Sequence, residues 1–181
     1  MPSRPHDAGW RGLAAGVPQV AVRALATNFG ARARDLIVAV GPSISAASYE
    51  VGAEVRDRFA AAGFGGSLPE WFPSATRPGH WLFDGWRSAR DQLVGAGVDG
   101  ADIHVSRLCT FTNTELCCSY RRDEAPCRTD GRRDPDAALL KLGIQNSEFR
   151  IPNSFHDRVV HRGVREAIGV RVHLAPDVFR R

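Results

Sequence analysis

The run of apolar residues at positions 36–40 constrains the fold more than any other stretch of this sequence. It extends from Leu36 to Val40 and is followed at once by Gly41 and Pro42. A short apolar run that ends at a Gly-Pro pair is typical of a strand buried on both faces. We therefore expect a central strand covered on both sides, followed by a loop over residues 41–45 that is suited to carry functional groups.

Three amphipathic segments predict helices. In residues 13–25 apolar side chains recur at helical spacing, and Pro18 fits the first turn. Residues 54–62 form a second segment, closed by Gly63, and residues 81–94 form a third. The side chains expected to face the core from the first and third helices are Leu13, Val17, Val20, Ala21, Ala24, Leu25, Trp86, Ala89, Leu93 and Val94.

The segments between these helices complete the predicted architecture. Residues 63–80 are rich in Gly, Pro and Ser and predict a surface loop. Residues 103–108 alternate apolar and polar side chains, which predicts a strand with one exposed face. Helices that alternate with strands predict an α/β or α+β fold, with layered mixed β-sheets flanked by helices.

The composition limits the class of protein. A chain of 181 residues, 43% hydrophobic and 24% charged, is typical of one globular domain with or without an appendage. Apolar runs are too short to span a membrane, so we expect a cytoplasmic protein without a membrane partner. The net charge of +4 arises after residue 120, where acidic residues lie among the arginines. This mixed pattern does not favour nucleic acid as a partner.

The segment 6–16 has the composition of a ligand-binding loop. Gly9 and Gly12 flank Trp10 and Arg11, and glycine allows the backbone to approach a ligand closely. The guanidinium of Arg11 offers planar donors that suit phosphate or another oxyanion. The alternative is a tight turn with an arginine on the surface.

Five ordered motifs carry a resemblance to a known family. They are Ala8-Gly9-Trp10-Arg11-Gly12, Gly41-Pro42-x-Ile44, Tyr49-Glu50-Val51-Gly52, Cys109-Thr110-Phe111-Thr112 and Ser119-Tyr120-Arg121-Arg122-Asp123. Over residues 6–128 their order and spacing resemble the YfiH-type multicopper polyphenol oxidase, or laccase-domain, family. The resemblance implies the compact YfiH-like α/β fold. It also implies phosphorolysis of adenosine, inosine or methylthioadenosine, often with adenosine deamination, at a zinc site.

The resemblance further implies a zinc ion held by two histidines and one cysteine. One histidine directly precedes Ala-Gly-Trp-Arg-Gly, where this chain has Asp7, with His6 one residue earlier. The other two ligands belong to upstream segments, so we expect an N-terminally truncated domain in which His6 and Asp7 are the metal candidates. A catalytic zinc site needs three protein ligands. Copper is not expected, because laccase-type oxidases need many histidines.

Charged residues of the motifs are candidates for chemistry, as the resemblance implies. Arg11 and Arg121 are the catalytic candidates, because arginine serves phosphorolysis by positioning phosphate and by its charge. Arg122 is a candidate for substrate binding. The alternative for each arginine is a surface ion pair of little energetic value. Glu50 either orients a ligand or caps the next helix.

Four further residues complete the candidate substrate site: Trp10, Tyr49, Cys109 and Tyr120. For the two tyrosines the alternative is packing in the core. Cys109 matches the cysteine of the family's Cys-Thr-Tyr-Thr motif, which is not the zinc cysteine. The four cysteines of the chain contain no Cys-x-x-Cys pair, so neither a disulfide framework nor a cysteine zinc site is indicated.

Residues 129–181 depart from the family pattern and are expected to form a divergent basic tail behind a family domain at 6–128. One interpretation is a shifted reading frame, because G+C-rich codons for residues 127–133, read one base later, encode Ala-Gly-Arg-Met-Ala-Gly, which resembles the family's ending. A comparable shift within residues 2–7 restores a histidine before Ala-Gly-Trp-Arg-Gly. The alternative is a genuine module with a short helix at 134–142 and a strand at 170–174.

Three functional hypotheses follow from these patterns. The first is a zinc-dependent purine nucleoside phosphorylase with adenosine deaminase activity, impaired by missing zinc ligands, whose partners are a purine nucleoside and phosphate. The second is an inactive fragment, or an interaction protein, that retains part of the fold. The third is copper-dependent oxidation of phenols, which the small number of histidines disfavours.

Overall fold

The computed structural model describes residues 6–117, 119–123 and 168–174, with the backbone alone described in 6–8 and 168–174. A four-stranded sheet has the order β1-β6-β2-β5. Its strands are β1 (His6–Ala8), β2 (Leu36–Val40), β5 (Ile103–Val105) and β6 (Ile168–Leu174). Strand β6 is antiparallel to both β1 and β2, whereas β2 and β5 are parallel. The sheet therefore joins strands from both ends of the described chain.

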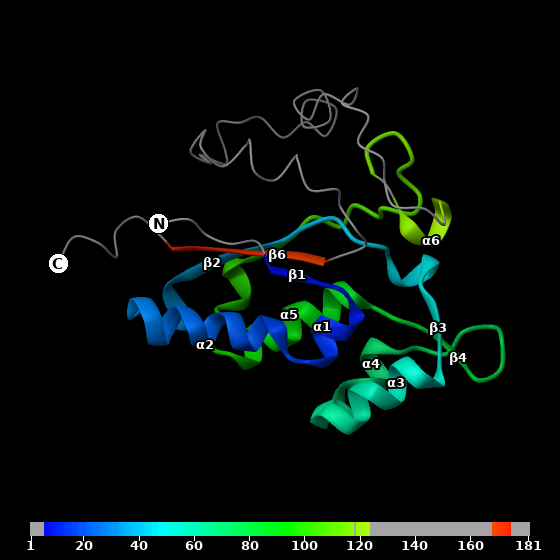
Figure 1. Ribbon diagram of the computed structural model, residues 1–181, viewed down its shortest axis with the longest axis horizontal. Helices are drawn as coiled ribbons and strands as arrows, with labels where there is room; N and C mark the ends of the chain where they lie inside the picture. The colour runs from blue at the N-terminus through cyan, green and yellow to red at the C-terminus, as the bar shows by residue number, and fades with distance from the viewer. Residues whose placement is uncertain (1–5, 118, 124–167, 175–181) are drawn as a thin grey trace.

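Helices α1 (Trp10–Ala14), α2 (Val17–Phe29) and α5 (Gly85–Gly95) lie along one side of this sheet (Figure 1). The helix predicted over 13–25 is divided at Gly16, whose φ of 71° is left-handed. Pro18 lies in the first turn of α2, as predicted. Because the second helix restarts after this break, its buried face is rotated. Val20 is 49% exposed and Val22 is buried, so the prediction for Val20 was wrong.

Strand β2 has the predicted bounds, but the prediction of cover on both faces was wrong. Leu36, Val38 and Val40 are at most 1% exposed, whereas Ile37 is 38% exposed. Side chains alternate between the two faces of a strand. The buried set packs under the helices, while Ile37 lies on the opposite face. A strand made only of apolar residues is thus buried on one face and not on both.

A second, two-stranded sheet pairs β3 (Glu50–Gly52) with β4 (His80–Leu82) in antiparallel register. It lies beside α3 (Ala53–Phe59) and α4 (Leu68–Trp71), away from the larger sheet (Figure 1). Helix α6 (Tyr120–Asp123) follows β5 in the chain. Short helical turns connect these elements: η1 (Ala33–Asp35), η2 (Ala46–Ser48), η3 (Ala60–Phe64), η4 (Gly65–Ser67) and η5 (Gly100–Asp102).

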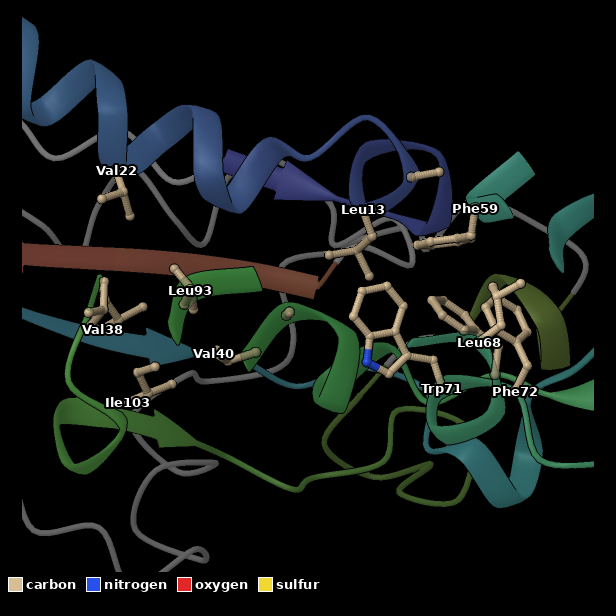
Figure 2. Packing of buried hydrophobic residues seen from close by; sticks show 14 of the residues in the cluster. Leu13, Val22, Val38, Val40, Phe59, Leu68, Trp71, Phe72, Leu93 and Ile103 are labelled. Atoms are coloured by element: carbon tan, nitrogen blue, oxygen red, sulfur yellow. The ribbon is translucent and has the colours of Figure 1, made fainter. Parts of the chain in front are cut away.

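The segment 63–80 is not the surface loop that its composition predicts. Leu68, Trp71 and Phe72 are buried and gather around the ring of Phe59 (Figure 2). The rings of Phe59 and Phe72 are 5.3 Å apart between centroids, and those of Phe59 and Trp71 are 5.9 Å apart. Large aromatic side chains here override the preference of Gly and Pro for loops, because burying each ring removes a large apolar area from water.

Helix α5 begins at Gly85 and not at residue 81, because residues 80–82 pair with β3. The side chain of Asp84 caps it by accepting from the backbone N–H of Arg87 at 2.9 Å. Ala89 and Leu93 are buried as predicted, but Val94 is 43% exposed, so that prediction was wrong. The helix buries Ser88 and Gln92 instead.

The layered α/β class is confirmed, with two mixed or antiparallel sheets and flanking helices. The strand predicted at 170–174 is confirmed as part of β6, and it pairs inside the main sheet. The helix predicted at 134–142 lies outside the described residues. Within the described part of the chain, no helix has the length and apolar character needed to cross a membrane.

Candidate functional site

A pocket of about 520 Å³ lies where α1, β3, α3, β4 and α6 meet. Its walls carry three arginines, two glutamates and one histidine, together with two aromatic rings. The lining residues are Trp10, Arg11, Tyr49, Glu50, Val51, Gly52, Glu54, Val55, Arg77, His80 and Arg121. Four of the residues predicted as site residues, Trp10, Arg11, Tyr49 and Arg121, are therefore brought together here.

Helix α1 carries Trp10 and Arg11 to the pocket. It begins directly after Gly9, which continues the chain from β1. Cζ of Arg11 lies 4.5 Å from the centroid of the Trp10 ring, within the range of a cation–π contact. Two features fix this short helix: Leu13 is fully buried, and Nε2 of buried Gln92 donates to the Leu13 carbonyl at 3.0 Å. The core thus holds the loop that presents Arg11.

Helix α6 brings Arg121 to the same pocket. Nη2 of Arg121 donates to the backbone carbonyl of Glu50 at 3.0 Å, and its Cζ lies 5.4 Å from the Tyr49 ring centroid. The Tyr49 ring also lies 5.7 Å from the ring of Phe83, which is fully buried. The two roles considered for Tyr49 therefore coincide, because one residue packs on the core and lines the pocket.

Three ionisable residues of the pocket escaped the sequence prediction: Glu54, Arg77 and His80. Nε of Arg77 donates to Nδ1 of His80 at 3.0 Å and lies 3.6 Å from Oε1 of Glu50. The pairing of Gly52 with His80 between β3 and β4 brings this group to the wall. Because residues 63–80 were predicted as a surface loop, no pattern placed Arg77 or His80 beside the Tyr-Glu-Val-Gly motif.

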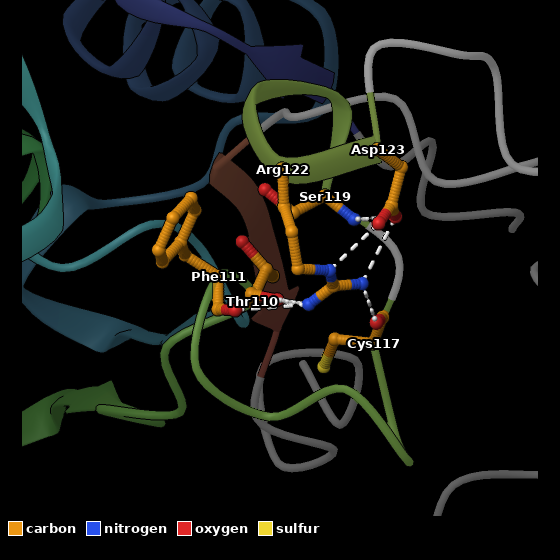
Figure 3. Close-up of polar contacts among 6 residues, drawn as sticks. All are labelled: Thr110, Phe111, Cys117, Ser119, Arg122 and Asp123. Carbon is orange, nitrogen blue, oxygen red and sulfur yellow. Dashed lines mark hydrogen bonds and ion pairs between the residues drawn. The ribbon is translucent and has the colours of Figure 1, made fainter.

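Arg122 lies in a closed hydrogen-bond network outside the pocket (Figure 3). Nη1 donates to the carbonyls of Thr110 and Phe111 at 3.0 and 2.9 Å, and Nη2 donates to the carbonyl of Cys117 at 3.0 Å. Nε and Nη2 also bind the carboxylate of Asp123 at 2.7 and 2.9 Å. These contacts account for all five donors of a guanidinium. The structure therefore places Arg122 as a link between α6 and the 110–117 loop.

Cys109 is buried and lies outside the pocket lining. Its Sγ accepts hydrogen bonds from the backbone N–H and the Oγ of Ser45 at 3.3 and 3.2 Å. Burial raises the pKa of this thiol, but the hydrogen bonds from Ser45 and Thr112 outweigh burial and lower the pKa to about 6. Burial raises the pKa of Cys117, against a lowering effect of nearby Arg122. Cys109 is thus a structural thiolate candidate and not part of the pocket wall.

The remaining predicted residues are also placed away from the pocket, or their side chains are not described. Tyr120 is 61% exposed on α6 and does not line the pocket. His6 and Asp7 form β1, where their backbone pairs with Val170 and Gly169. Within the described residues, no group of three or more His, Cys, Asp or Glu side chains could hold a metal ion. The side chains of His6 and Asp7 are not among those the structure describes, so the zinc site expected from the resemblance stays a prediction.

The fold and the pocket together define a layered α/β protein with a site suited to an anionic or phosphate-bearing small molecule. Residues 6–133 match the family described as multi-copper polyphenol oxidoreductase laccase. The chain belongs to this family, and the resemblance seen in its five motifs is confirmed.

Relatives and solved structures agree with this assignment. A purine nucleoside phosphorylase of Pseudomonas aeruginosa is 43% identical over 115 residues, which cover 64% of this chain and 44% of the relative. Purine nucleoside phosphorylase YfiH of Escherichia coli is 35% identical over 125 residues, covering 69% of this chain and 46% of the relative. The chain therefore spans less than half the length of these relatives.

The structure of Bacillus licheniformis protein YfiH is similar, with a TM-score of 0.60 and 28% identity. The match covers 64% of this chain and 43% of that protein. A Neisseria meningitidis protein gives a TM-score of 0.56 at 32% identity, covering 65% of this chain and 45% of the other. The predicted YfiH-like fold is confirmed.

Proposed function

We propose that this chain binds a purine nucleoside and inorganic phosphate in the pocket, and that the pocket supports phosphorolysis of the glycosidic bond. The observation that carries the proposal is the convergence of Arg11, Arg77 and Arg121 on one pocket that also holds Trp10 and Tyr49. The names of the relatives, which are purine nucleoside phosphorylases, support the same substrates.

Arg11 and Arg121 are the residues we assign to phosphate. Each guanidinium presents several donors in a rigid plane, which suits the oxygens of a phosphate dianion. They enter the pocket from different helices, α1 and α6, so a phosphate between them would be held from two sides. Arg77 is already within ion-pair distance of Glu50, and we assign it to shaping the wall.

Phosphorolysis needs little from the protein beyond position and charge. A phosphate oxygen forms a bond to C1′ of the ribose as the bond from C1′ to the purine nitrogen breaks. The electron pair leaves with the base, which takes up the proton that hydrogen phosphate gives up. The sugar passes through an oxocarbenium-like state whose positive charge the adjacent phosphate stabilises. Holding phosphate and nucleoside together in a reactive geometry, and stabilising the charge that develops, together supply a large part of the rate gain in such reactions. The rings of Trp10 and Tyr49 offer the apolar surface that a purine requires.

The zinc ion and the adenosine deamination expected from the sequence are not part of the proposed phosphorolysis. Deamination in zinc enzymes uses a metal-bound water, and the side chains of the metal candidates His6 and Asp7 are not described. We therefore derive no step through a metal. Zinc content and inosine formation from adenosine remain quantities to measure on the same sample.

The test is hypoxanthine release from inosine by the purified full chain, with and without phosphate. We expect release that requires phosphate and yields ribose 1-phosphate in equal amount. A folded protein, shown by a cooperative unfolding transition, that releases no hypoxanthine would contradict the proposal.

A second candidate is a nucleoside-binding or interaction protein without turnover. Inosine binding without hypoxanthine release would support this candidate over the enzyme.

A further inference from the structure

Two carboxylates line the pocket, and their surroundings differ. Oε1 of Glu50 lies 3.6 Å from Nε of Arg77, and the backbone carbonyl of Glu50 accepts a hydrogen bond from Arg121. Glu54 lies in the first turn of α3 but does not cap that helix. Among the residues that the structure describes, Glu54 has no ion pair or hydrogen bond. Glu54 is therefore the carboxylate of the pocket that remains to be explained.

The position of the Glu54 carboxylate depends on Gly52. A Cβ atom added at Gly52 would overlap Oε2 of Glu54 and would lie 3.1 Å from its Cδ. The carboxylate thus lies against the backbone at the end of β3, on the strand that pairs with His80. The absence of a side chain at position 52 lets Glu54 fold over the pocket wall.

We propose that Glu54 accepts hydrogen bonds from the ribose hydroxyls of the nucleoside, and that it makes the pocket select ribonucleosides over 2′-deoxyribonucleosides. This inference rests on the proposed function of the pocket. A carboxylate has acceptor sites on both oxygens and no donor, so it matches a vicinal pair of hydroxyls. Carboxylates bind ribose hydroxyls in this way in dinucleotide-binding folds.

The charge distribution of the pocket favours this assignment over contact with phosphate or base. A carboxylate repels a phosphate dianion, and the arginines of the pocket already provide for that group. The base of inosine offers one N–H donor, at N1, whereas the ribose offers two adjacent hydroxyls and must lie next to the phosphate that attacks it. Glu54 is left facing the neutral, hydroxyl-bearing part of the substrate.

The experiment measures equilibrium binding of inosine and of 2′-deoxyinosine to the full chain by titration calorimetry without phosphate. For the unaltered protein we expect 2′-deoxyinosine to bind about 10- to 100-fold more weakly. In Glu54→Gln this ratio is expected to fall below about 3-fold, because the charged acceptor is lost. Gly52→Ala keeps the carboxylate but displaces it, and should lower the ratio too.

Asp57→Asn is the matched control, since Asp57 is exposed on the same helix and does not line the pocket. It should keep the ratio of the unaltered protein, and unfolding midpoints of all variants will show whether they fold. Equal binding of the two nucleosides, or an unchanged ratio in Glu54→Gln, overturns the inference. Ribonucleoside selectivity without hypoxanthine release sustains it while rejecting phosphorolysis. A folded protein that binds neither nucleoside overturns both.

Discussion

Arg121 and Arg122 are neighbours in one motif, yet they belong to two different regions of the molecule. Arg121 reaches over Tyr49 into the pocket between α1, β3 and α3. Arg122 points the other way, into the 110–117 loop, where carbonyl groups and Asp123 surround its guanidinium (Figure 3). Adjacent positions of α6 thus carry one residue on a pocket wall and one residue that holds a loop.

The comparison shows that two adjacent arginines can have different roles: one is available to bind a ligand, and the other holds the protein structure together. A guanidinium whose five donors are all used by protein acceptors has none left for a ligand. The Arg122 network fixes α6, and α6 in turn fixes the direction of Arg121. The pocket region and the loop region therefore depend on each other structurally, but they should respond differently to mutation.

The largest expected effect is on catalysis, from Arg121→Ala and from Arg11→Ala. Each should lower kcat/KM for inosine phosphorolysis by about 100- to 1,000-fold, the scale seen when one charge-stabilising donor is removed. The unfolding free energy should change by less than about 1 kcal/mol, because both side chains lie at the surface. Steady-state kinetics and urea unfolding measure the two quantities.

Arg23→Ala is the control for these two variants, since Arg23 is exposed on α2 away from the pocket. If Arg121→Ala keeps the activity of this control, then Arg121 has no role in catalysis and the functional contrast with Arg122 is wrong.

The next effect is on stability, from Arg122→Ala. It leaves the carbonyls of Thr110, Phe111 and Cys117 without their donor. Unpaired acceptors in partly buried positions are costly, so we expect the unfolding free energy to fall by about 2–3 kcal/mol. Urea unfolding beside Arg121→Ala checks the contrast. Equal stability of the two variants would show that the Arg122 network is not a structural support.

A smaller effect concerns the pH dependence of stability in the loop region. The pKa of Cys109 is about 6 in the folded protein, below the unfolded value of about 8.5. Above pH 6 the folded thiol has lost its proton while the unfolded thiol keeps it, so stability rises with pH up to about 8.5 and is lost as pH falls through 6. We expect a gain of about 1 kcal/mol between pH 6 and pH 7 relative to Cys109→Ser.

Urea unfolding between pH 6 and pH 7 measures the gain, and Cys117→Ser is the control, because Cys117 should not change the pH slope in this range. The raised pKa of Cys117 gives the opposite sign, so its contribution is present at low pH and is lost as pH rises above the unfolded value. Identical pH slopes in the unaltered protein and in Cys109→Ser would refute the lowered pKa.

The smallest effect is expected from Tyr120→Ala. Tyr120 stands directly before the two arginines in the motif, but it is 61% exposed and outside the pocket. We expect kcat/KM to change less than about 2-fold and stability by less than about 0.5 kcal/mol. A large rise in KM would show that Tyr120 contacts the substrate, as the sequence analysis predicts.

Local patterns of the sequence correctly predicted several elements. The bounds of β2 follow from one apolar run ended by Gly41 and Pro42, and Pro18 lies in the first turn of α2. The closing role of Gly63 follows from the conformation that glycine allows, since its φ is 91°. Each of these features depends on a few adjacent residues, so no distant contact was needed to predict it.

Which side chains are buried depends on the elements that pack against them, and this could not be predicted from local sequence patterns. Ile37 belongs to the same apolar run as Val38, yet it is exposed, because the described helices cover one face of the sheet. Trp71 and Phe72 lie in a segment with loop composition, yet they form the core around Phe59. Burial is a property of the assembled layers, which a single segment does not contain.

The sequence by itself determined the family, through five ordered motifs, and it named Trp10, Arg11, Tyr49 and Arg121 as residues of one site. The tertiary structure alone decided that Glu54, Arg77 and His80 join them and that Arg122 does not. The physical reason is that a motif fixes residue types at a spacing, whereas the direction of each side chain is fixed by the helix turn and the strand register that carry it.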